Sequence, residues 1–264
     1  MLIYLRDLVK HTNNLGIEVI KITTEKDGNV KVEAMDNDKN IVVKGKFNGE
    51  VPELEGVCGL GQLDWLNGFL NIYNQKDDSV DVKRELKKFS VVVKDAAGDT
   101  KLDNDGNPIY EQVEENVICE LVFKRDSEKM KNPYRVVDKR MIPTQFNFVG
   151  ADWDVEITPS AAAIDMLGKQ ASVGYETSFG VKTEGGDLYV VLGNPDLQAS
   201  FLFAKDVKGE MTQPWTWDIG RVLNILKWSS NAECTMFFLD KGILQITLKT
   251  GLAEYNYILP AKSR

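Results

Sequence analysis

The sequence predicts an α+β protein made of two similar halves. Short runs of alternating apolar and polar residues, typical of half-buried strands, recur throughout and are separated by turns such as Asp-Gly and Gly-Gly. Four longer stretches carry apolar residues at helical spacing. The elements follow in the same order before and after the middle of the chain, and residues 25–32 and 70–72 resemble residues 184–190 and 223–225. Chance similarity among β-rich segments is the alternative to a duplicated domain.

The middle of the chain, residues 129–148, contains two prolines and five basic side chains and has no continuous helical or strand period. Proline fixes φ and removes a backbone donor, so this stretch is predicted to be an extended connector and not the interior of an element. We therefore expect an N-terminal domain over residues 1–128 and a C-terminal domain over residues 149–264.

The first half is predicted to begin with a helix over Leu2–Leu15. A second amphipathic helix is expected over Gln62–Asn74, and a long turn around Asp103–Asn107. Alternating or apolar runs predict strands at residues 17–25, 30–35, 41–47, 57–60, 80–86, 88–95 and 116–124.

The second half repeats this order after a strand at residues 152–157. A helix through about Ala171 follows, with Thr158 predicted as its N-cap and Pro159 as its first residue. Another helix is expected over Asp218–Ser229. Further strands are predicted at residues 174–183, 187–193, 197–205, 234–240, 243–250 and 253–261.

The composition fits a folded protein of a reducing compartment. Hydrophobic residues make up 43% of the 264 residues, enough for sizeable cores. Cys58, Cys119 and Cys234 are isolated from one another, which suggests neither a disulfide framework nor a zinc cluster. Charges near the start and the lack of a long apolar run predict a cytosolic protein with no membrane partner. The net charge of −8 argues against a uniformly basic DNA coat but leaves a local basic lining open.

No set of residues indicates an enzyme. The only histidine, His11, is predicted on the polar surface of the first helix, without a partner for nucleophilic catalysis. The run Asp103–Gly106 lacks the glutamate and the spacing of a calcium loop, so a hairpin turn is favoured. We therefore expect no catalytic residues, no metal and no cofactor.

Basic side chains on the predicted helices are the remaining candidates for a functional surface. Each helix also carries an acid, so ordinary solvated faces with ion pairs and contact with DNA stay open as alternatives. If the helices lined one concave surface, their cations would contact phosphates without reading the sequence. The candidate DNA-facing residues are Arg6, Lys10, Lys76, Lys169, Arg221 and Lys227.

Three stretches resemble the DNA sliding clamps of the proliferating cell nuclear antigen type, and especially their phage relatives. Residues 34–43 resemble the family's strand-turn-strand with Met-Asp at the turn. Residues 63–70 resemble the helix after the fifth strand. The ending Tyr255–Lys262 resembles the aromatic, aliphatic, Pro-Lys terminus of these clamps. The duplication and the connector extend the resemblance over nearly the whole chain.

The resemblance implies a closed ring around double-stranded DNA, with helices lining the hole and six domains supplied by a homotrimer. It also implies edge strands that pair between subunits, for which we expect residues 116–124 and 197–205. A DNA polymerase and a clamp loader would insert short apolar tails into a pocket beneath the connector. By resemblance, its lining would be Met35, Ile41, Val43, Val136, Val137, Met141, Ile142, Tyr257, Leu259 and Pro260.

The leading hypothesis is thus a phage-encoded processivity factor acting in the host cytoplasm. Two alternatives stay open at this stage. One is a monomeric clamp-like factor that binds DNA with a single basic face, and the other is a β-rich virion or scaffold protein with no role on DNA.

Overall fold

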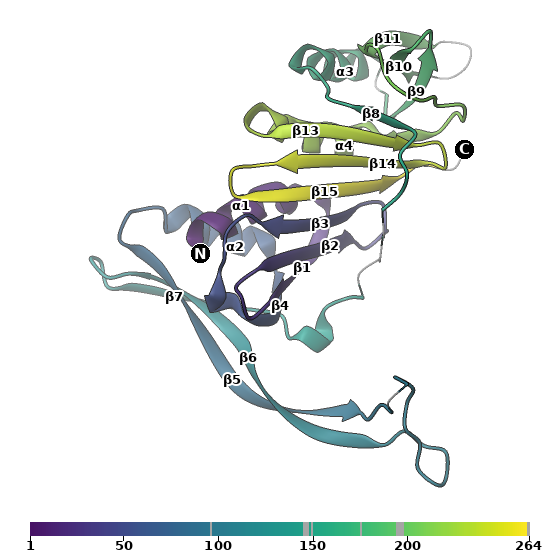
Figure 1. The fold of residues 1–264 in the computed structure, drawn as a ribbon. Helices are drawn as coiled ribbons and strands as arrows, with labels where there is room; N and C mark the ends of the chain where they lie inside the picture. Colours follow the sequence, from purple (N-terminus) through teal and green to yellow (C-terminus); the bar gives the residue numbers. More distant parts are fainter. Residues whose placement is uncertain (96, 145–147, 149, 175, 194–197, 263–264) are drawn as a thin grey trace.

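The computed structural model describes residues 1–95, 97–144, 148, 150–174, 176–193 and 198–262, and every structural statement concerns this part of the chain. A large sheet forms the body, helices cover one side of it, and a long β-hairpin reaches away from it (Figure 1). Among the described residues, no helix is long and apolar enough to cross a membrane.

The first half contains two helices and seven strands. Its helices are α1 (Leu2–Thr12) and α2 (Leu63–Ile72). Its strands are β1 (Ile17–Thr24), β2 (Val30–Asp36), β3 (Val42–Phe47), β4 (Gly56–Gly61), β5 (Asp78–Val92), β6 (Tyr110–Arg125) and β7 (Met130–Arg135). Three short 3₁₀ turns accompany them, η1 (Asn13–Leu15), η2 (Pro52–Leu54) and η3 (Lys139–Met141).

The second half contains α3 (Ala161–Gly174), α4 (Ile219–Leu226) and the 3₁₀ segment η4 (Lys227–Asn231). Its strands are β8 (Val155–Ile157), β9 (Ser178–Glu184), β10 (Asp187–Leu192), β11 (Ala199–Ala204), β12 (Thr216–Asp218), β13 (Glu233–Leu239), β14 (Ile243–Lys249) and β15 (Ala253–Pro260).

The strand order shows that the two halves are copies of one unit, as predicted. The first half pairs its strands as β4-β1-β2-β3 and β5-β6-β7, and the second half as β12-β9-β10-β11 and β13-β14-β15. Pairing of β3 with β15 joins the halves, giving one eight-stranded sheet in the order β4-β1-β2-β3-β15-β14-β13-β8.

Two strands at opposite ends of this arrangement have an open outer edge. By the repeat, β11 corresponds to β3 and β7 corresponds to β15. Whereas β3 and β15 pair with each other, β11 and β7 have no strand on their outer side among the described residues. The expectation that residues 116–124 form the edge strand is wrong, because they lie in β6 and β6 pairs with both β5 and β7.

The local signals in the sequence explain most turns and helix starts. The predicted turn between β1 and β2 has Gly28 at φ 86°, where a Cβ atom would also approach Glu50 Cβ to 2.9 Å. Asp218 caps α4 by accepting from the backbone N–H of Arg221 at 2.9 Å. The prediction of Thr158 as the cap of the third helix is wrong, because Ser160 Oγ accepts from the backbone N–H of Ala163 and the helix begins two residues later than expected.

Two stretches differ from their predicted elements. The first part of the connector is not a loop but the strand β7, which tolerates Pro133 because it is an edge strand. The separate strands expected at residues 80–86 and 88–95 form the single strand β5, with an irregularity between Lys83 and Arg84. With β6 it makes the long hairpin that extends beyond the body (Figure 1).

A buried aromatic cluster joins α1 of the first half to the second half. The prediction of a surface His11 is wrong, since this residue is only 2% exposed. Its ring stacks on Tyr255 at 4.8 Å and meets Trp228 edge-on at 5.2 Å, and its Nδ1 donates to the carbonyl oxygen of Asp7 at 2.7 Å. Burial lowers the pKa of His11. The residues that cover it come from the other end of the chain, so helical periodicity could not reveal its burial.

Candidate DNA-facing and partner-binding surfaces

The helices α1, α2 and α4 lie on the same side of the eight-stranded sheet, with α3 next to α4 (Figure 1). Apolar residues at helical spacing turn inward, as Leu5 and Leu8 of α1 do, and polar side chains turn to solvent. This helical face is therefore the surface on which the predicted DNA-facing residues have to be placed.

Two of the six predicted DNA-facing residues, Arg6 and Arg221, bond to other groups of the protein. The Arg6 guanidinium donates to the carbonyl oxygens of Leu70 and Tyr73 and so caps the C-terminal end of α2. Arg221 pairs with the buried Asp36 of β2 at 2.7 Å and thereby fastens α4 to the first half. Both arginines have structural roles that neither residue type nor helix position indicates.

The other four, Lys10, Lys76, Lys169 and Lys227, are exposed. Lys169 pairs with Asp165 one turn earlier at 2.6 Å, and Lys227 donates to the side chain of Asn224 at 3.2 Å. Such exposed contacts are weak and leave the cations available to another anion. The helical face is thus only mildly basic, because Asp64 and Asp165 share it with the four lysines.

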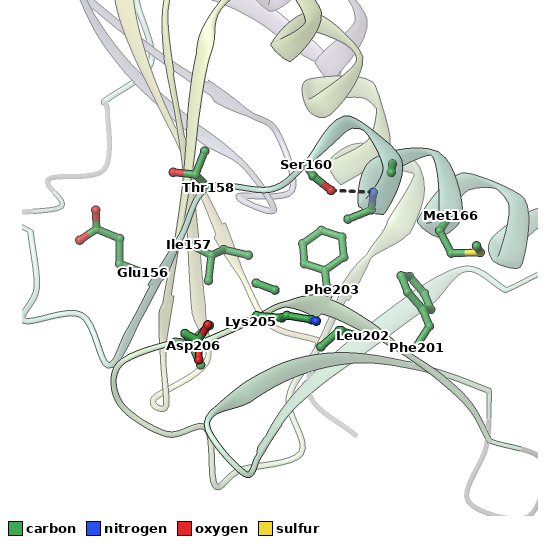
Figure 2. A pocket seen from close by; sticks show the side chains of 14 residues that line it. Glu156, Ile157, Thr158, Ser160, Met166, Phe201, Leu202, Phe203, Lys205 and Asp206 are labelled. Carbon is green, nitrogen blue, oxygen red and sulfur yellow. Dashed lines mark hydrogen bonds between the residues drawn. The ribbon is translucent and has the colours of Figure 1, made fainter.

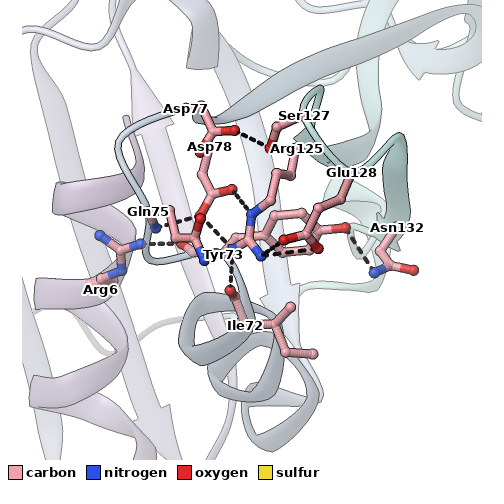
Figure 3. Close-up of polar contacts among 10 residues, drawn as sticks. All are labelled: Arg6, Ile72, Tyr73, Gln75, Asp77, Asp78, Arg125, Ser127, Glu128 and Asn132. Carbon is pink, nitrogen blue, oxygen red and sulfur yellow. Dashed lines mark hydrogen bonds and ion pairs between the residues drawn. The ribbon is translucent and has the colours of Figure 1, made fainter.

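A second arginine holds α2 from the opposite side (Figure 3). Arg125 of β6 makes a two-pronged ion pair with Asp78 of β5, with N–O distances of 2.8 and 3.0 Å, and also donates to the carbonyl oxygen of Ile72 at 2.7 Å. Both side chains are shielded from solvent, and the hydrogen bonds from Arg125 lower the pKa of Asp78. This pair ties the end of α2 to the base of the long hairpin.

The residues predicted for the partner pocket fall into three groups that the structure does not bring together: core residues, residues of the outer face of the sheet, and connector residues at the edge of β4. Ile41, Val43, Tyr257 and Leu259 are at most 1% exposed and face the helices, as the hydrogen bond from Tyr257 Oη to the carbonyl oxygen of His11 shows for one of them. They belong to the core and cannot line a pocket on the outer face of the sheet.

The outer face carries the alternate residues of the same strands. Met35, Val42 and Ile258 form one cross-strand row, and Met35 is half-buried while Pro260 is exposed at the end of β15. Towards β13 the row passes through the polar Gln245 of β14 and then reaches Phe237, which packs against Trp153 at 5.7 Å. Its apolar part, Met35, Val42 and Ile258, lies at the junction between the two halves.

The connector residues lie elsewhere, at the outer edge of β4. Val137 exchanges two backbone hydrogen bonds with Gly59, of 2.7 and 3.0 Å. A side chain at Gly59 would collide with Val137 and Ile142, at 2.9 and 3.1 Å, so glycine is required for this close approach. Val136 is half-buried, and Met141 of η3 is 76% exposed.

Each end of the molecule presents an apolar surface beside one of the open strand edges. At one end, Trp65, Phe69 and Ile72 form a stripe on the outer side of α2, where Trp65 is 68% exposed. Tyr73, one residue beyond α2, accepts a hydrogen bond from Asn132 of β7 at 2.8 Å, so the stripe and the open edge of β7 are neighbours.

At the other end, a cavity of about 620 Å³ lies between α3, β8 and the open edge strand β11 (Figure 2). Its lining includes Met166 of α3 together with Phe201, Leu202 and Phe203 of β11. Met166 and Leu202 are exposed although they are apolar. An apolar stripe beside one open edge and an apolar hollow beside the other are complementary features of the two ends.

No protein-family model matches the sequence, and no curated protein matches it. Solved structures are similar over nearly the full length. The PCNA of A. fulgidus, in a structure with the C-terminal region of FEN-1 bound, is 12% identical, with 98% of this chain and 95% of that chain covered and a TM-score of 0.66. The chain has a PCNA-like sliding-clamp fold. The PCNA of Thermococcus kodakaraensis is 14% identical (99% and 97% covered, TM-score 0.65), and that of Entamoeba histolytica is 13% identical (99% and 96%, TM-score 0.62).

Within this PCNA-like fold, features that depend on contacts between distant residues have no signal in the sequence. At the end that contains α3, the exposed Met166 has no signal beyond its presence on a helix that already has another apolar face. For α2 that second face could have been found, since positions 65, 69 and 72 follow helical spacing. The Arg125–Asp78 pair spans 47 positions and has no local signature.

Proposed function

We propose that this protein is a non-enzymatic sliding clamp, three copies of which close a ring around double-stranded DNA and tether a DNA polymerase. The observation that carries the proposal is the repeat itself. The junction between β3 and β15 inside the chain has a counterpart in β11 and β7, the strands left open at opposite ends. Pairing β11 of one copy with β7 of the next repeats the internal junction between chains. The clamp fold, with two units per chain, supports closure as a homotrimer.

The side chains at the two ends support the same head-to-tail contact. The stripe of Trp65, Phe69 and Ile72 beside β7 faces the hollow beside β11 in such a ring, and Trp65 is of a size to enter that hollow. Buried aromatic anchors of this kind commonly dominate the binding energy of an interface. A heterologous contact joins two different patches. It closes into a ring when the rotation from one copy to the next is a full turn divided by a whole number, which is one third of a turn for three copies.

Weak contact with DNA suits a clamp that slides. We propose that four exposed lysines contact phosphates without reading bases: Lys10, Lys76, Lys169 and Lys227. Arg6 and Arg221 are not among them, because both bond to groups of the protein itself. The mildly basic character of the helical face keeps the contacts with phosphate salt-sensitive and short-lived. A tight basic coat would hinder sliding.

The remaining parts of the proposal concern organisation and partners. The working division is a domain of residues 1–128, a connector of residues 129–148 and a domain of residues 149–264. Apolar tails of the polymerase and of a clamp loader are proposed to dock on the outer face near Met35, Ile258 and Pro260, beside the end of the connector at Phe148, whose carbonyl oxygen accepts a hydrogen bond from Lys44. A phage genome as source and the host cytoplasm as location belong to the same proposal.

The first test is the mass in solution. A ring should elute with three times the chain mass of 29.7 kDa, measured by light scattering after gel filtration. Trp65→Glu and Met166→Glu, one variant for each end, should each reduce the mass to that of one chain, because a buried unpaired carboxylate is strongly unfavourable. Ile3→Glu, on an exposed apolar residue of α1, is the matched control and should leave the mass unchanged. A wild-type protein of one chain mass would refute the ring.

The second test is retention on DNA. With the clamp loader encoded in the same genome, the protein should stay on nicked circular plasmid during gel filtration and be lost when the plasmid is linearised. A monomeric factor that binds by one face would be retained equally on both forms. A structural protein with no role on DNA would be retained on neither.

A further inference from the structure

The far end of the connector is fixed to both halves of the molecule. On the first half, Nζ of Lys44 in β3 donates to the carbonyl oxygen of Phe148 at 2.7 Å, although the two residues are 104 positions apart. On the second half, the Phe148 ring packs against Trp153 at 5.9 Å, and Trp153 packs against Phe237 of β13 at 5.7 Å. The end of the connector is therefore held at two points, one on each half.

These two points lie on the outer face of the eight-stranded sheet, on strands that are not neighbours. The sheet order is β3-β15-β14-β13, so β15 and β14 separate the strands that carry Lys44 and Phe237. Strands of one sheet are about 4.8 Å apart, which puts roughly 14 Å between the two points. Figure 1 shows the chain that leads from the connector to β8 crossing in front of the ends of β15 and β14. The end of the connector thus spans the junction between the halves.

The apolar residues at this junction are covered, although they lie on the outer face. Val42 and Ile258 are paired across β3 and β15, and they are 6% and 5% exposed. On an uncovered face of an antiparallel sheet, such side chains would be in contact with water. Lys44 follows Val42 on the same face, and Phe237 is in the row of Ile258, beyond Gln245. The chain that is held between Lys44 and Phe237 therefore passes over the two covered residues.

The polar residues on either side of Lys44 have partners of their own. Glu33, opposite Lys44 on β2, pairs with Lys21 at 2.6 Å. Asn256, opposite Lys44 on β15, accepts a hydrogen bond from Oγ1 of Thr247 at 2.6 Å. The ammonium group of Lys44 reaches over them to a backbone carbonyl of the connector. A hydrogen bond from a charged donor is stronger than one between neutral groups, so this contact favours the closed position of the connector end.

We propose that the hydrogen bond from Lys44 to Phe148 is an autoinhibitory contact. It keeps the connector end closed over Val42 and Ile258 until an apolar tail of the DNA polymerase displaces it. The inference rests on the proposed clamp function and adds a means of regulation to the proposed docking site. The tail binds only molecules in which the row is open, so its apparent affinity is reduced by the fraction that is open. In the absence of a partner, the closed form keeps an apolar patch out of water.

Three variants of the full-length protein test the contact. Lys44→Met removes the ammonium group and keeps a long side chain, whereas Lys44→Arg keeps a charged donor. Lys46→Met is the matched control, because Lys46 lies two residues further along the same face of β3, opposite Glu254. All three should keep the wild-type mass and the retention on nicked circles, since β3 pairs on both sides within the chain and lies at neither open end.

The main measurement is the rate at which each variant binds and leaves the DNA polymerase encoded in the same genome. Lys44→Met should bind about 10-fold more tightly, because loss of one charge-assisted hydrogen bond shifts the connector end towards the open position. The gain should appear as faster association with unchanged dissociation, since the substitution acts on the free protein and not on the complex. Lys44→Arg and Lys46→Met should bind like wild type.

The fluorescence of Trp153 gives a second readout that does not need the polymerase. Acrylamide quenching of this residue is obtained as the difference between each protein and its Trp153→Phe counterpart. Quenching should increase in Lys44→Met, because the Phe148 ring that packs against Trp153 is no longer held. It should stay at the wild-type value in Lys44→Arg and Lys46→Met. Equal quenching in all four proteins would show that the connector end does not depend on Lys44, and would overturn the inference.

Other outcomes of the binding experiment also overturn it. Unchanged affinity of Lys44→Met would show that the contact does not control access to the row. Weaker binding would make Lys44 and the connector end part of the docking surface. Tighter binding by Lys46→Met as well would assign the effect to charge alone. If wild type is not retained on nicked circles, the clamp function fails and the inference fails with it. Retention of wild type together with unchanged binding by Lys44→Met removes the autoinhibitory contact alone.

Discussion

The β5–β6 and β13–β14 connections occupy the same place in the two halves and have opposite designs. In the second half, the turn is packed against its own body, where Trp215 Nε1 donates to the carbonyl oxygen of Asp240 at 2.6 Å and Gly242 lies against the Trp215 ring. In the first half, the same connection extends outward as an arm, residues 84–118, and most of its described side chains are exposed. We infer from this difference that the contacts that stabilise the fold lie at the base of each strand pair, and that the outer arm contributes little to stability.

The largest expected effect is at the base of the arm. Arg125→Ala removes the hydrogen bonds to Asp78 and to the carbonyl oxygen of Ile72, and it leaves a shielded carboxylate without a partner. We expect the thermal midpoint to fall by roughly 5–10 °C. Arg125→Lys should recover only part of the loss, because an ammonium group cannot reproduce the two-pronged geometry.

Arg135→Ala is the matched control for Arg125→Ala. Arg135 lies on the neighbouring strand β7 with an 89% exposed side chain, and its contact with Glu120 is long at 3.9 Å. Its replacement should move the midpoint by about 1 °C or less. Equal effects of the two substitutions would contradict the idea that the base of the hairpin carries stability.

Two glycines compare the packed turn with the free one. Gly242 has φ 86°, and a Cβ atom there would lie 3.0 Å from the Trp215 ring, whereas Gly106 in the arm has φ 84° and open space around it. Gly242→Ala should therefore destabilise the protein by about 2–3 kcal/mol, from strain and collision together. Gly106→Ala should lower stability by about 1 kcal/mol or less, from backbone strain alone. Urea denaturation measures both, and a larger effect at Gly106 would reverse the comparison.

The duplication could be predicted because both halves carry their own local signals. Asp-Gly and Gly-Gly turns, helical spacing and the cap Asp218 act within a few residues and survive in any context. The pairing of β3 with β15 is different, since it joins strands about two hundred positions apart. A single sequence contains no local signal for a strand's partner. For the same reason the prediction that residues 116–124 form an edge strand is wrong, because β7 pairs with them.

The pocket residues show a second reason for failure. Neighbouring residues of a strand point to opposite faces, so an error of one position exchanges core and surface. The resemblance predicts Val43 and Tyr257 as lining of a pocket beneath the connector, yet they lie in the core, and their neighbours Val42 and Ile258 belong to the outer row. Among the helical cations, the role of Arg221 could not be predicted, because it pairs with Asp36 at a separation of 185 positions.

A smaller effect is expected where the two halves meet around His11. Its pKa is lowered in the folded protein by burial, while Asp7 and Lys10 are the charged groups nearest to it. The unfolded chain therefore binds the proton first as the pH falls below about 6.5, and folding stability decreases there by up to about 1.4 kcal/mol per pH unit. His11→Gln should remove this slope between about pH 6.5 and pH 5 in urea titrations. A wild-type curve that is flat over that interval would show that the pKa of His11 is the same in the folded and the unfolded chain, and would contradict the prediction.

The smallest effect on stability should come from removing the arm tip. Replacing residues 93–109 with Asn-Gly gives β5 and β6 a two-residue turn like those that suit antiparallel hairpins. Among the described residues, it discards the half-buried Val93, otherwise exposed side chains, and turns that bond to one another. The free energy of unfolding should change by less than about 0.5 kcal/mol, since no core side chain is lost. The shortened protein should keep the mass and the retention on nicked circles of the full chain. A larger loss of unfolding free energy than in the Gly242→Ala variant would contradict this prediction. It would show that the arm stabilises the fold, and that the two connections differ only in length.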